Sequence, residues 1–336
     1  MREAAVTAPA LRFEWDTCSR ARWQQLLATA PLAGYRQDWP YGEAVAAQGH
    51  RVRRCLLTAG GRPLALAQFV ERRFAAGPGL VVLTHGPVWL GERGAEAEAA
   101  LFAEARRTFL RGLLLWTPAD GRAADRRAGF RRVMTGQSTI HLDLRRPPAR
   151  IEAGLHGKWR NMLRRARQAP LEVKRIRGGP LLAWLIAANE THRRRVGYRG
   201  PSPAFFHALA GASRASDSQF ALIARRGSTP VAGALFQLHG RGATYLIGHT
   251  GEEGRRLRAQ YLLLWRAIEM LRERGVALLD LGGVDTVGAP GVARFKLGLG
   301  GRVVTFAGTY LVPLPWRGRQ PELQDQDASR RKERAA

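Results

Sequence analysis

Apolar and polar residues alternate over short stretches in both halves of the chain, and segments with apolar residues at helical spacing separate these stretches. Alternation predicts strands, and a spacing of three and four residues predicts amphipathic helices. In the first half, the paired glycines Gly60 and Gly61 predict a β-hairpin. The elements expected there are a helix over 19–30, strands over 52–57, 64–73 and 80–83, a helix over 95–111, and strands over 112–117 and 139–144.

The second half shows the same two patterns in a different order. Turns at 226–230 and 239–242 divide one stretch into an antiparallel meander of three strands. Gly275 follows the next helix, at the position where glycine commonly ends a helix. The elements expected are helices over 151–168, 180–196, 203–212, 257–274 and 292–297, and strands over 171–176, 219–226, 231–239, 243–248, 277–281 and 303–312.

Two prolines, Pro147 and Pro148, interrupt regular structure near the middle of the chain. We therefore predict two domains, over 12–146 and 150–312, followed by a disordered tail over 313–336 that has no periodic apolar positions. The fold class expected is α/β (α+β), with mixed, mostly antiparallel sheets flanked by helices. The two halves share a coarse order of helix, hairpin, helix and strand, which suggests duplication.

Apolar runs in the chain are too short for the roughly 18–20 residues that cross a bilayer, and the N-terminus lacks the apolar core of a signal peptide. We therefore expect a cytoplasmic protein, with peripheral contact at the inner face of the membrane. The formal net charge is +27, with 54 Lys and Arg residues against 27 Asp and Glu residues. Such a surface attracts the phosphates of RNA, of lipid headgroups and of phosphorylated or lipid-linked precursors. No stable protein partner can be inferred.

Two segments concentrate this positive charge where phosphates bind. Residues 251–260 lie between a strand and a helix, and Arg255 and Arg258 accompany the helix start, where free N–H groups favour anions. Residues 158–167 form a basic amphipathic helix, and Lys158, Arg160 and Arg164 are expected to contact phosphates of RNA, a membrane surface or a substrate. The alternative for both segments is an ordinary solvated basic surface.

Three residues near the C-terminal end of the predicted fold are suited to acyl-transfer chemistry. Asp280 and Asp285 flank Gly282-Gly283 at a strand end, where a carboxylate could accept a proton from an attacking amine or could cap the turn. Lys296 is one of only four lysines in a chain that uses arginine freely, and it precedes a glycine-rich turn. Its ammonium could stabilise the oxyanion of acyl transfer or bind a phosphate; the alternative is a surface lysine.

Several enzyme classes are excluded by their missing motifs. The eight histidines show no metal-ligand spacing, and the two cysteines form no CxxC, so we expect no metal. The chain also lacks a G-x-S-x-G nucleophile elbow, a Walker A loop and a dinucleotide-binding G-x-G-x-x-G.

Four blocks of the sequence resemble the Fem family of peptidoglycan-bridge aminoacyltransferases and related FemAB-like proteins of the GNAT superfamily. The first is the Q-x-W-x-Y-G opening within 35–42, which contains Trp39 and Tyr41, and the second is the basic helix at 158–166. The third is 191–197 with the aromatic pair at 205–206. The most specific is the fourth, which runs from 263–268 through 279–283 to 295–300 and includes Lys296.

This resemblance implies two tandem GNAT-like acyltransferase domains, a substrate groove between them, and a lysine, matched by Lys296, that assists transfer. It implies that Trp39 and Tyr41 help to bind substrate, and that aminoacyl-tRNA is the donor to an amine of a peptidoglycan precursor. His85 precedes Gly86-Pro87 where the family often has arginine, with Glu92 the nearest acid.

Two other functions stay open. The first is an acyl-CoA-dependent N-acyltransferase acting on an envelope polysaccharide or lipid precursor. The residues 255–259 lack the central glycine of the Q/R-x-x-G-x-G/A loop that binds acyl-CoA in GNAT enzymes, which counts against this donor. The second is a non-catalytic module that binds anions. In all three, no cofactor is expected to remain bound, and the donor is a substrate.

Overall fold

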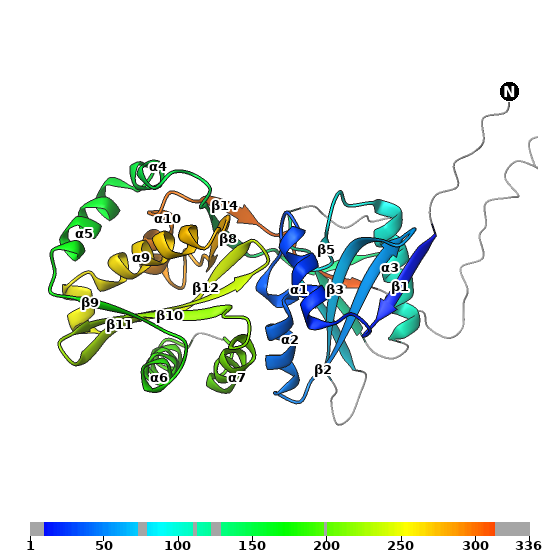
Figure 1. Ribbon diagram of the computed structural model, residues 1–336, viewed down its shortest axis with the longest axis horizontal. Helices are drawn as coiled ribbons and strands as arrows, with labels where there is room; N and C mark the ends of the chain where they lie inside the picture. The colour runs from blue at the N-terminus through cyan, green and yellow to red at the C-terminus, as the bar shows by residue number, and fades with distance from the viewer. Residues whose placement is uncertain (1–9, 73–78, 110–112, 122–128, 198–199, 313–336) are drawn as a thin grey trace, which may run out of the picture.

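The computed structural model describes residues 10–72, 79–109, 113–121, 129–197 and 200–312. The predicted tail over 313–336 lies outside these residues. Two lobes lie side by side, and each is built on one twisted sheet with helices on both faces (Figure 1). Mixed, mostly antiparallel sheets flanked by helices were predicted, and the structure confirms them. Within the described part of the chain, no helix has the length and apolar character needed to cross a membrane.

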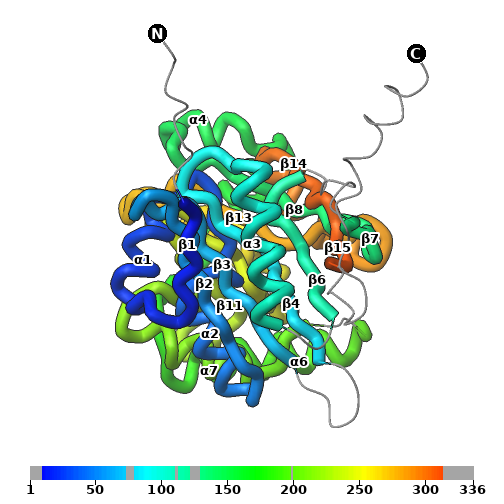
Figure 2. Tube along the Cα trace, turned by 90° about the vertical axis from the view of Figure 1, so that its right-hand side faces the viewer, coloured from blue at the N-terminus to red at the C-terminus, as the bar shows by residue number. Residues whose placement is uncertain are grey.

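The first sheet has the strand order β1-β2-β3-β4-β6-β15-β7, with β5 paired to β3. Its only parallel pair among these is β4 with β6, and the predicted hairpin forms β2 and β3. Helix α3 covers one face, while α1 and α2 cover the other (Figures 1 and 2). The elements are β1 Leu11–Trp15, α1 Arg20–Thr29, the 3-10 helix η1 Tyr35–Gln37, α2 Trp39–Ala46, β2 Arg51–Ala59, β3 Arg62–Arg72, β4 Leu80–Thr84, β5 Val88–Trp89, α3 Ala95–Thr108, β6 Leu113–Thr117 and β7 Arg131–Met134.

The second sheet has the order β14-β8-β13-β12-β11-β10-β9, and β12 with β13 is its parallel pair. Strand β10 is apolar on both sides because Phe220 and Leu222 pack under α5 and α9, whereas Ala221 and Ile223 pack against α6 and α7. The elements are β8 Ser138–Asp143, α4 Pro148–Ala153, α5 Gly157–Arg167, β9 Glu172–Ile176, α6 Pro180–Arg195, α7 Pro203–Ser213, β10 Gln219–Arg226, β11 Thr229–His239, β12 Gly242–Thr250, α8 Glu252–Arg256, α9 Ala259–Glu273, β13 Leu278–Gly283, α10 Pro290–Leu297, β14 Arg302–Thr305 and β15 Thr309–Val312.

Two strands lie in a different sheet from the one expected, and one of them returns from the second lobe to the first. The strand predicted at 139–144 was placed in the first domain, but β8 lies in the second sheet between β13 and β14. The single strand predicted over 303–312 is two strands, because β14 pairs with β8 whereas β15 pairs with β6 and β7 of the first sheet. Alternation identifies a strand, but it carries no information about the strand's partner.

The predicted helix over 257–274 is also divided in the structure. A five-residue helix, α8, ends at Arg256, and α9 begins at Ala259. Arg258 between them has φ 59° and ψ 29°, a left-handed conformation that interrupts the helix. The predicted basic helix start is therefore a short basic turn before α9. Gly154 similarly separates α4 from α5, which were predicted as one helix.

Candidate active site

The pairing between the parallel strands β12 and β13 ends in the middle of the second sheet. Their pairing covers three residues and ends where Thr244 lies opposite Asp280, although β12 continues to Thr250. Just beyond this point, the register between β11 and β12 shifts by one residue at Leu246, which forms a bulge. Bulges next to an unpaired strand end often lie beside active sites, because they leave backbone groups free to bind a ligand. We call this region the strand split.

Lys296 on α10 reaches the edge of the strand split. Its Nζ donates to the backbone oxygen of Gly283 at 2.8 Å and lies 5.9 Å from the ring centroid of Tyr245. Burial lowers the pKa of Lys296 to about 8, and the charge of Asp280 partly opposes this effect. A compact cation with a depressed pKa thus lies between the ends of β12 and β13. The predicted role of Lys296 in transfer is not tested by this geometry.

The two predicted carboxylates occupy different positions. Asp280 lies close enough to Lys296 for their charges to interact, and its Oδ1 accepts hydrogen bonds from Thr139 Oγ1 and from the N–H of Gly282 at 2.8 Å. Gly282 has φ +72°, so the turn after Asp280 needs glycine. Asp285 is exposed, and its Oδ1 accepts from the N–H groups of Val287 and Gly288. These contacts are those of a residue that caps its own loop, which was the stated alternative.

A polar chain leads from Lys296 to the start of α9, and the sequence analysis missed it. The hydroxyl of Tyr245 accepts from Gln260 Nε2 at 2.9 Å, and Thr250 Oγ1 donates to Gln260 Oε1 at 3.1 Å. Burial raises the pKa of Tyr245, so the phenol stays neutral. A Cβ on Gly248 would lie 1.8 Å from the Tyr245 hydroxyl, so this glycine makes room for the ring. In the sequence, Tyr245 is one residue of an alternating strand, and only the nearby Gly248 distinguishes it.

The predicted phosphate-binding arginines lie around the turn between β12 and α9. Arg255 donates from Nη1 to the backbone oxygen of Thr250 at 2.8 Å, and Arg258 donates to the backbone oxygen of Arg255. Glu253, the acid closest to them in sequence, is bonded to Arg226 and Arg256, and its pKa is lowered to about 2 by these contacts. The first N–H groups of α9 have no acceptor within the helix. The turn therefore presents positive charge beside the strand split.

The basic helix forms as predicted, and it adjoins α10. Trp159 and Leu163 of α5 are buried, while Lys158, Arg160 and Arg164 are exposed on the outside. Trp159 Nε1 donates to the backbone oxygen of Phe295 at 3.1 Å, and the two rings are 5.9 Å apart. The buried side of α5 thus holds in place the helix that carries Lys296.

Trp39 and Tyr41 lie in packed aromatic clusters of the first lobe and its boundary. The guanidinium of Arg54 stacks 3.6 Å from the Trp39 ring centroid, and Trp39 Nε1 donates to Glu43. Tyr41 contacts Phe205 of α7, with ring centroids 5.8 Å apart. These contacts place Trp39 in the scaffold and Tyr41 at the junction of the two lobes. The substrate-binding role given to them by the resemblance stays a prediction.

Three histidines lie where the lobes meet, and their even scatter along the sequence concealed this. His141 lies opposite Asp280 in the sheet. His239 Nε2 and Thr244 Oγ1 form a hydrogen bond of 2.8 Å. The ring of His85 packs 4.8 Å from that of Phe306. Burial lowers the pKa of His239 to about 4 and that of His85 to about 3, so both are neutral at physiological pH. Neutral imidazoles thus border the strand split on its first-lobe side.

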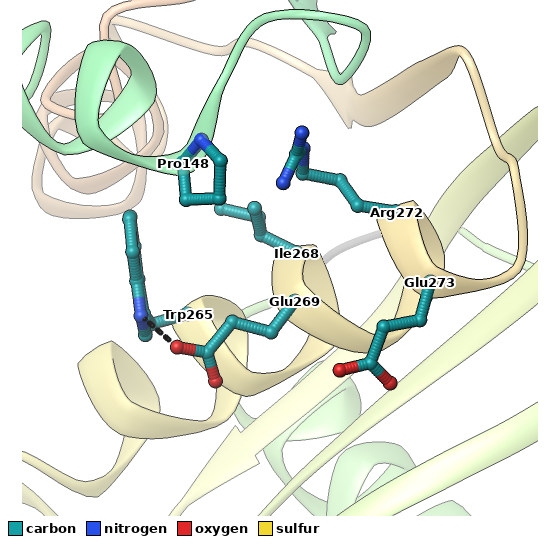
Figure 3. Close-up of a pocket in the computed structure, with 6 residues that line it drawn as sticks. All are labelled: Pro148, Trp265, Ile268, Glu269, Arg272 and Glu273. Atoms are coloured by element: carbon teal, nitrogen blue, oxygen red, sulfur yellow. Dashed lines mark hydrogen bonds between the residues drawn. The ribbon is translucent and has the colours of Figure 1, made fainter.

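A surface pocket of about 250 Å³ lies against the outer side of α9 (Figure 3). Two of its polar groups already have partners: Glu269 accepts from Trp265 and Arg266, and Arg272 donates to the backbone oxygen of Leu144. None of the predicted site residues lines it. We therefore assign no role in the reaction to this pocket.

The chain was compared with known proteins. Residues 156–297 match the model of the acetyltransferase (GNAT) domain family. No curated protein matches the chain. A crystal structure of FemX is similar, with a TM-score of 0.78 and 15% identity, over 90% of this chain and 97% of that one.

Two further solved structures are similar at lower scores. A tandem GNAT protein from the clavulanic acid biosynthesis pathway has a TM-score of 0.54 and 15% identity, over 91% of this chain and 99% of that one. The C-terminal domain of a putative lysylphosphatidylglycerol synthetase from Agrobacterium fabrum has a TM-score of 0.51 and 14% identity, over 88% and 93%. At such identities these structures establish the fold alone. The chain thus has the two-lobed, GNAT-like fold that FemX shares, and residues 156–297 of its second lobe match the acetyltransferase (GNAT) domain family.

Proposed function

We propose that the protein transfers an acyl or aminoacyl group to an amine of a cell-wall or envelope precursor, as Fem-type aminoacyltransferases do. One observation carries the proposal: Lys296 places a partly buried cation at the strand split, 2.8 Å from the Gly283 oxygen and beside Asp280. Acyl transfer develops negative charge on a carbonyl oxygen, and a preorganised cation in a site of low polarity stabilises that charge.

The reaction needs three events at this place. The substrate amine attacks the carbonyl carbon of the donor, a C–N bond forms, and the carbonyl oxygen becomes an oxyanion. Lys296, which is mostly protonated at neutral pH because its pKa is about 8, stabilises that oxyanion. The bond to the donor's oxygen or sulfur then breaks, the nitrogen loses a proton, and the donor leaves as its alcohol or thiol once that proton has reached it. Asp280, whose charge acts on Lys296, is the carboxylate proposed to accept the proton from nitrogen and pass it on.

Donor phosphates are assigned to the basic turn before α9. Arg255 and Arg258 lie there, and the N-terminus of α9 favours negative charge. An aminoacyl-tRNA offers a long run of phosphates to such a surface, so it is the donor proposed.

Acyl-CoA is a second candidate donor, and one observation favours it. Arg258 stands where the motif of acyl-CoA-binding loops has its central glycine, and it adopts a left-handed conformation, which glycine adopts most readily. A similar structure, described as a tandem GNAT protein without AcCoA, belongs to the same fold. Calorimetric titration of the protein with acetyl-CoA and with aminoacyl-tRNA separates the donors, because binding of only one rejects the other.

The test of the proposal is replacement of the lysine by an uncharged side chain of similar length. Lys296→Met is expected to lower transfer of a labelled acyl or aminoacyl group by roughly 100- to 1,000-fold, because the oxyanion loses its cation. The matched control is Lys174→Met on the exposed part of β9, which should retain full activity. If Lys296→Met keeps activity, Lys296 does not carry the reaction and the proposed site is wrong. If the wild type transfers nothing while Lys296→Ala still binds anions and preserves the cellular phenotype, the protein is an anion-binding module instead.

A further inference from the structure

The segment that carries Lys296 exposes aliphatic side chains to solvent. Val287 in the loop before α10 is 91% exposed, and on α10 Val292 is 52% and Leu297 is 40% exposed. These three residues lie within eleven positions of one another on a loop and one short helix. Scattered apolar surface residues are ordinary, but several on one projecting element indicate an interaction surface. We call Val287, Val292 and Leu297 the aliphatic rim.

Cations lie on α10 and on the helix that packs beside it. Arg294 is exposed on α10 itself, one turn from Leu297. Helix α5, which Trp159 fastens to α10, has the sequence GKWRNMLRRAR, with five cations and no acid. Of these, Arg167 is paired with Glu152, whereas Lys158 and Arg160 have no acid next to them on the helix. Asp285, the acid of the loop, uses Oδ1 for backbone N–H groups of that loop.

Strand β7, at the edge of the first sheet, also combines exposed aliphatic residues with arginines. Strand β7 reads Arg131-Arg132-Val133-Met134, and all four residues are exposed. In the loop before α10, the N–H of Val284 donates to Ser138, the first residue of β8, which follows Met134 by four positions. Figure 2 places β7 at the right-hand edge of the molecule. Each lobe thus exposes aliphatic and arginine side chains, on β7 in the first and on α10 in the second.

We propose that the side of the molecule that carries α10 docks on an anionic lipid bilayer. The aliphatic rim inserts among the headgroups, and the cations of α5 bind lipid phosphates. Exposed aliphatic side chains beside cations complement the interfacial region of such a bilayer, where apolar side chains leave water and basic side chains meet negative charge. RNA would use the cations as well, but single-stranded RNA is bound by aromatic stacking, and valine and leucine provide none.

Docking in this orientation would bring the strand split to the membrane. Val292 lies one helical turn before Lys296 on α10, so the aliphatic rim borders the proposed reaction site. A lipid-linked acceptor could then present its amine without leaving the bilayer. This consequence rests on the proposed function, whereas the docking itself does not.

The test is flotation of the full chain with phosphatidylcholine vesicles that contain phosphatidylglycerol, and with vesicles of phosphatidylcholine alone. We expect binding only to the anionic vesicles. Val287→Asp should weaken it roughly 10-fold or more, because an acid replaces an inserted valine and repels the surface. The matched control is Val196→Asp, since Val196 is 57% exposed just after α6, on the opposite face of the second sheet (Figure 1).

Three outcomes would overturn the proposal. The first is no binding to anionic vesicles, and the second is an equal loss of vesicle binding in both variants. The third is displacement of the protein from vesicles by tRNA, together with wild-type binding of tRNA and of vesicles by Val287→Asp. This third result would assign the surface to RNA. Transfer to a soluble amine without vesicles is measured in parallel. Loss of transfer in Lys296→Met with vesicle binding intact tests the reaction, and loss of vesicle binding in Val287→Asp with soluble transfer intact tests the docking, so the two failures are distinguishable.

Discussion

At the scale of single residues, the surroundings of Lys296 decide how its charge depends on pH. An exposed lysine keeps its proton throughout the range in which enzymes are assayed. Here burial lowers the pKa of Lys296 to about 8, because the negative charge of Asp280 raises this pKa by less than burial lowers it. The ammonium is therefore present at neutral pH and is lost as pH rises through about 8. Any step that needs the cation must weaken over the same interval.

Transfer activity is therefore expected to fall as pH rises through about 8 in the wild type. Lys296→Arg keeps its positive charge at every pH of the assay, so this variant, although slower, should lack the fall. The measurement is the pH profile of kcat/KM for both proteins on one acceptor, so that titration of the substrate amine affects both equally. The same descending limb in Lys296→Arg would assign it to another group.

At the scale of helices and strands, the sequence indicates which segments are regular more reliably than where they connect. The hairpin at Gly60-Gly61 and the meander up to Thr250 form as predicted, because alternation and turn glycines are local signals. The break at Arg258 carries no such signal, since arginine is a good helix former and adopts the left-handed conformation only because of its surroundings. The same reason hid Tyr245, which becomes a site neighbour only after β12 bulges and β13 turns away.

The break between α8 and α9 can be tested at Arg258 with two truncations. Both Arg258→Gly and Arg258→Ala remove the side chain, but only glycine adopts φ 59° without strain. The glycine variant should therefore be more stable than the alanine variant by about 1 kcal/mol, measured as the free energy of unfolding in urea. Were the helix continuous through this position, alanine would be the more stable by roughly the same amount. The order of the two variants thus decides between the two structures.

At the scale of the whole molecule, the two lobes are tied together in ways that a boundary at Pro147-Pro148 did not suggest. Strand β15 closes the first sheet from the far end of the chain, and β8 enters the second sheet from before the boundary. A shared core adds to this, since Ala44 and Val45 of α2 pack with Leu235 of β11 and its neighbours. The first sheet is not complete within one continuous stretch of the sequence, because β15 follows all seven strands of the second sheet. The lobes should therefore unfold together.

Leu235→Ala tests this coupling, because Leu235 is fully buried in the shared core. The cavity should lower the free energy of unfolding by about 2–5 kcal/mol. If the lobes unfold as one unit, the most slowly exchanging amides of β2 and β3 in the first lobe should lose as much protection from hydrogen exchange as those of β11 and β12 in the second. Val196→Ala, at an exposed position, is the control and should change neither lobe. Loss of protection confined to β11 and β12 would mean that the lobes unfold independently, even though β15 connects them.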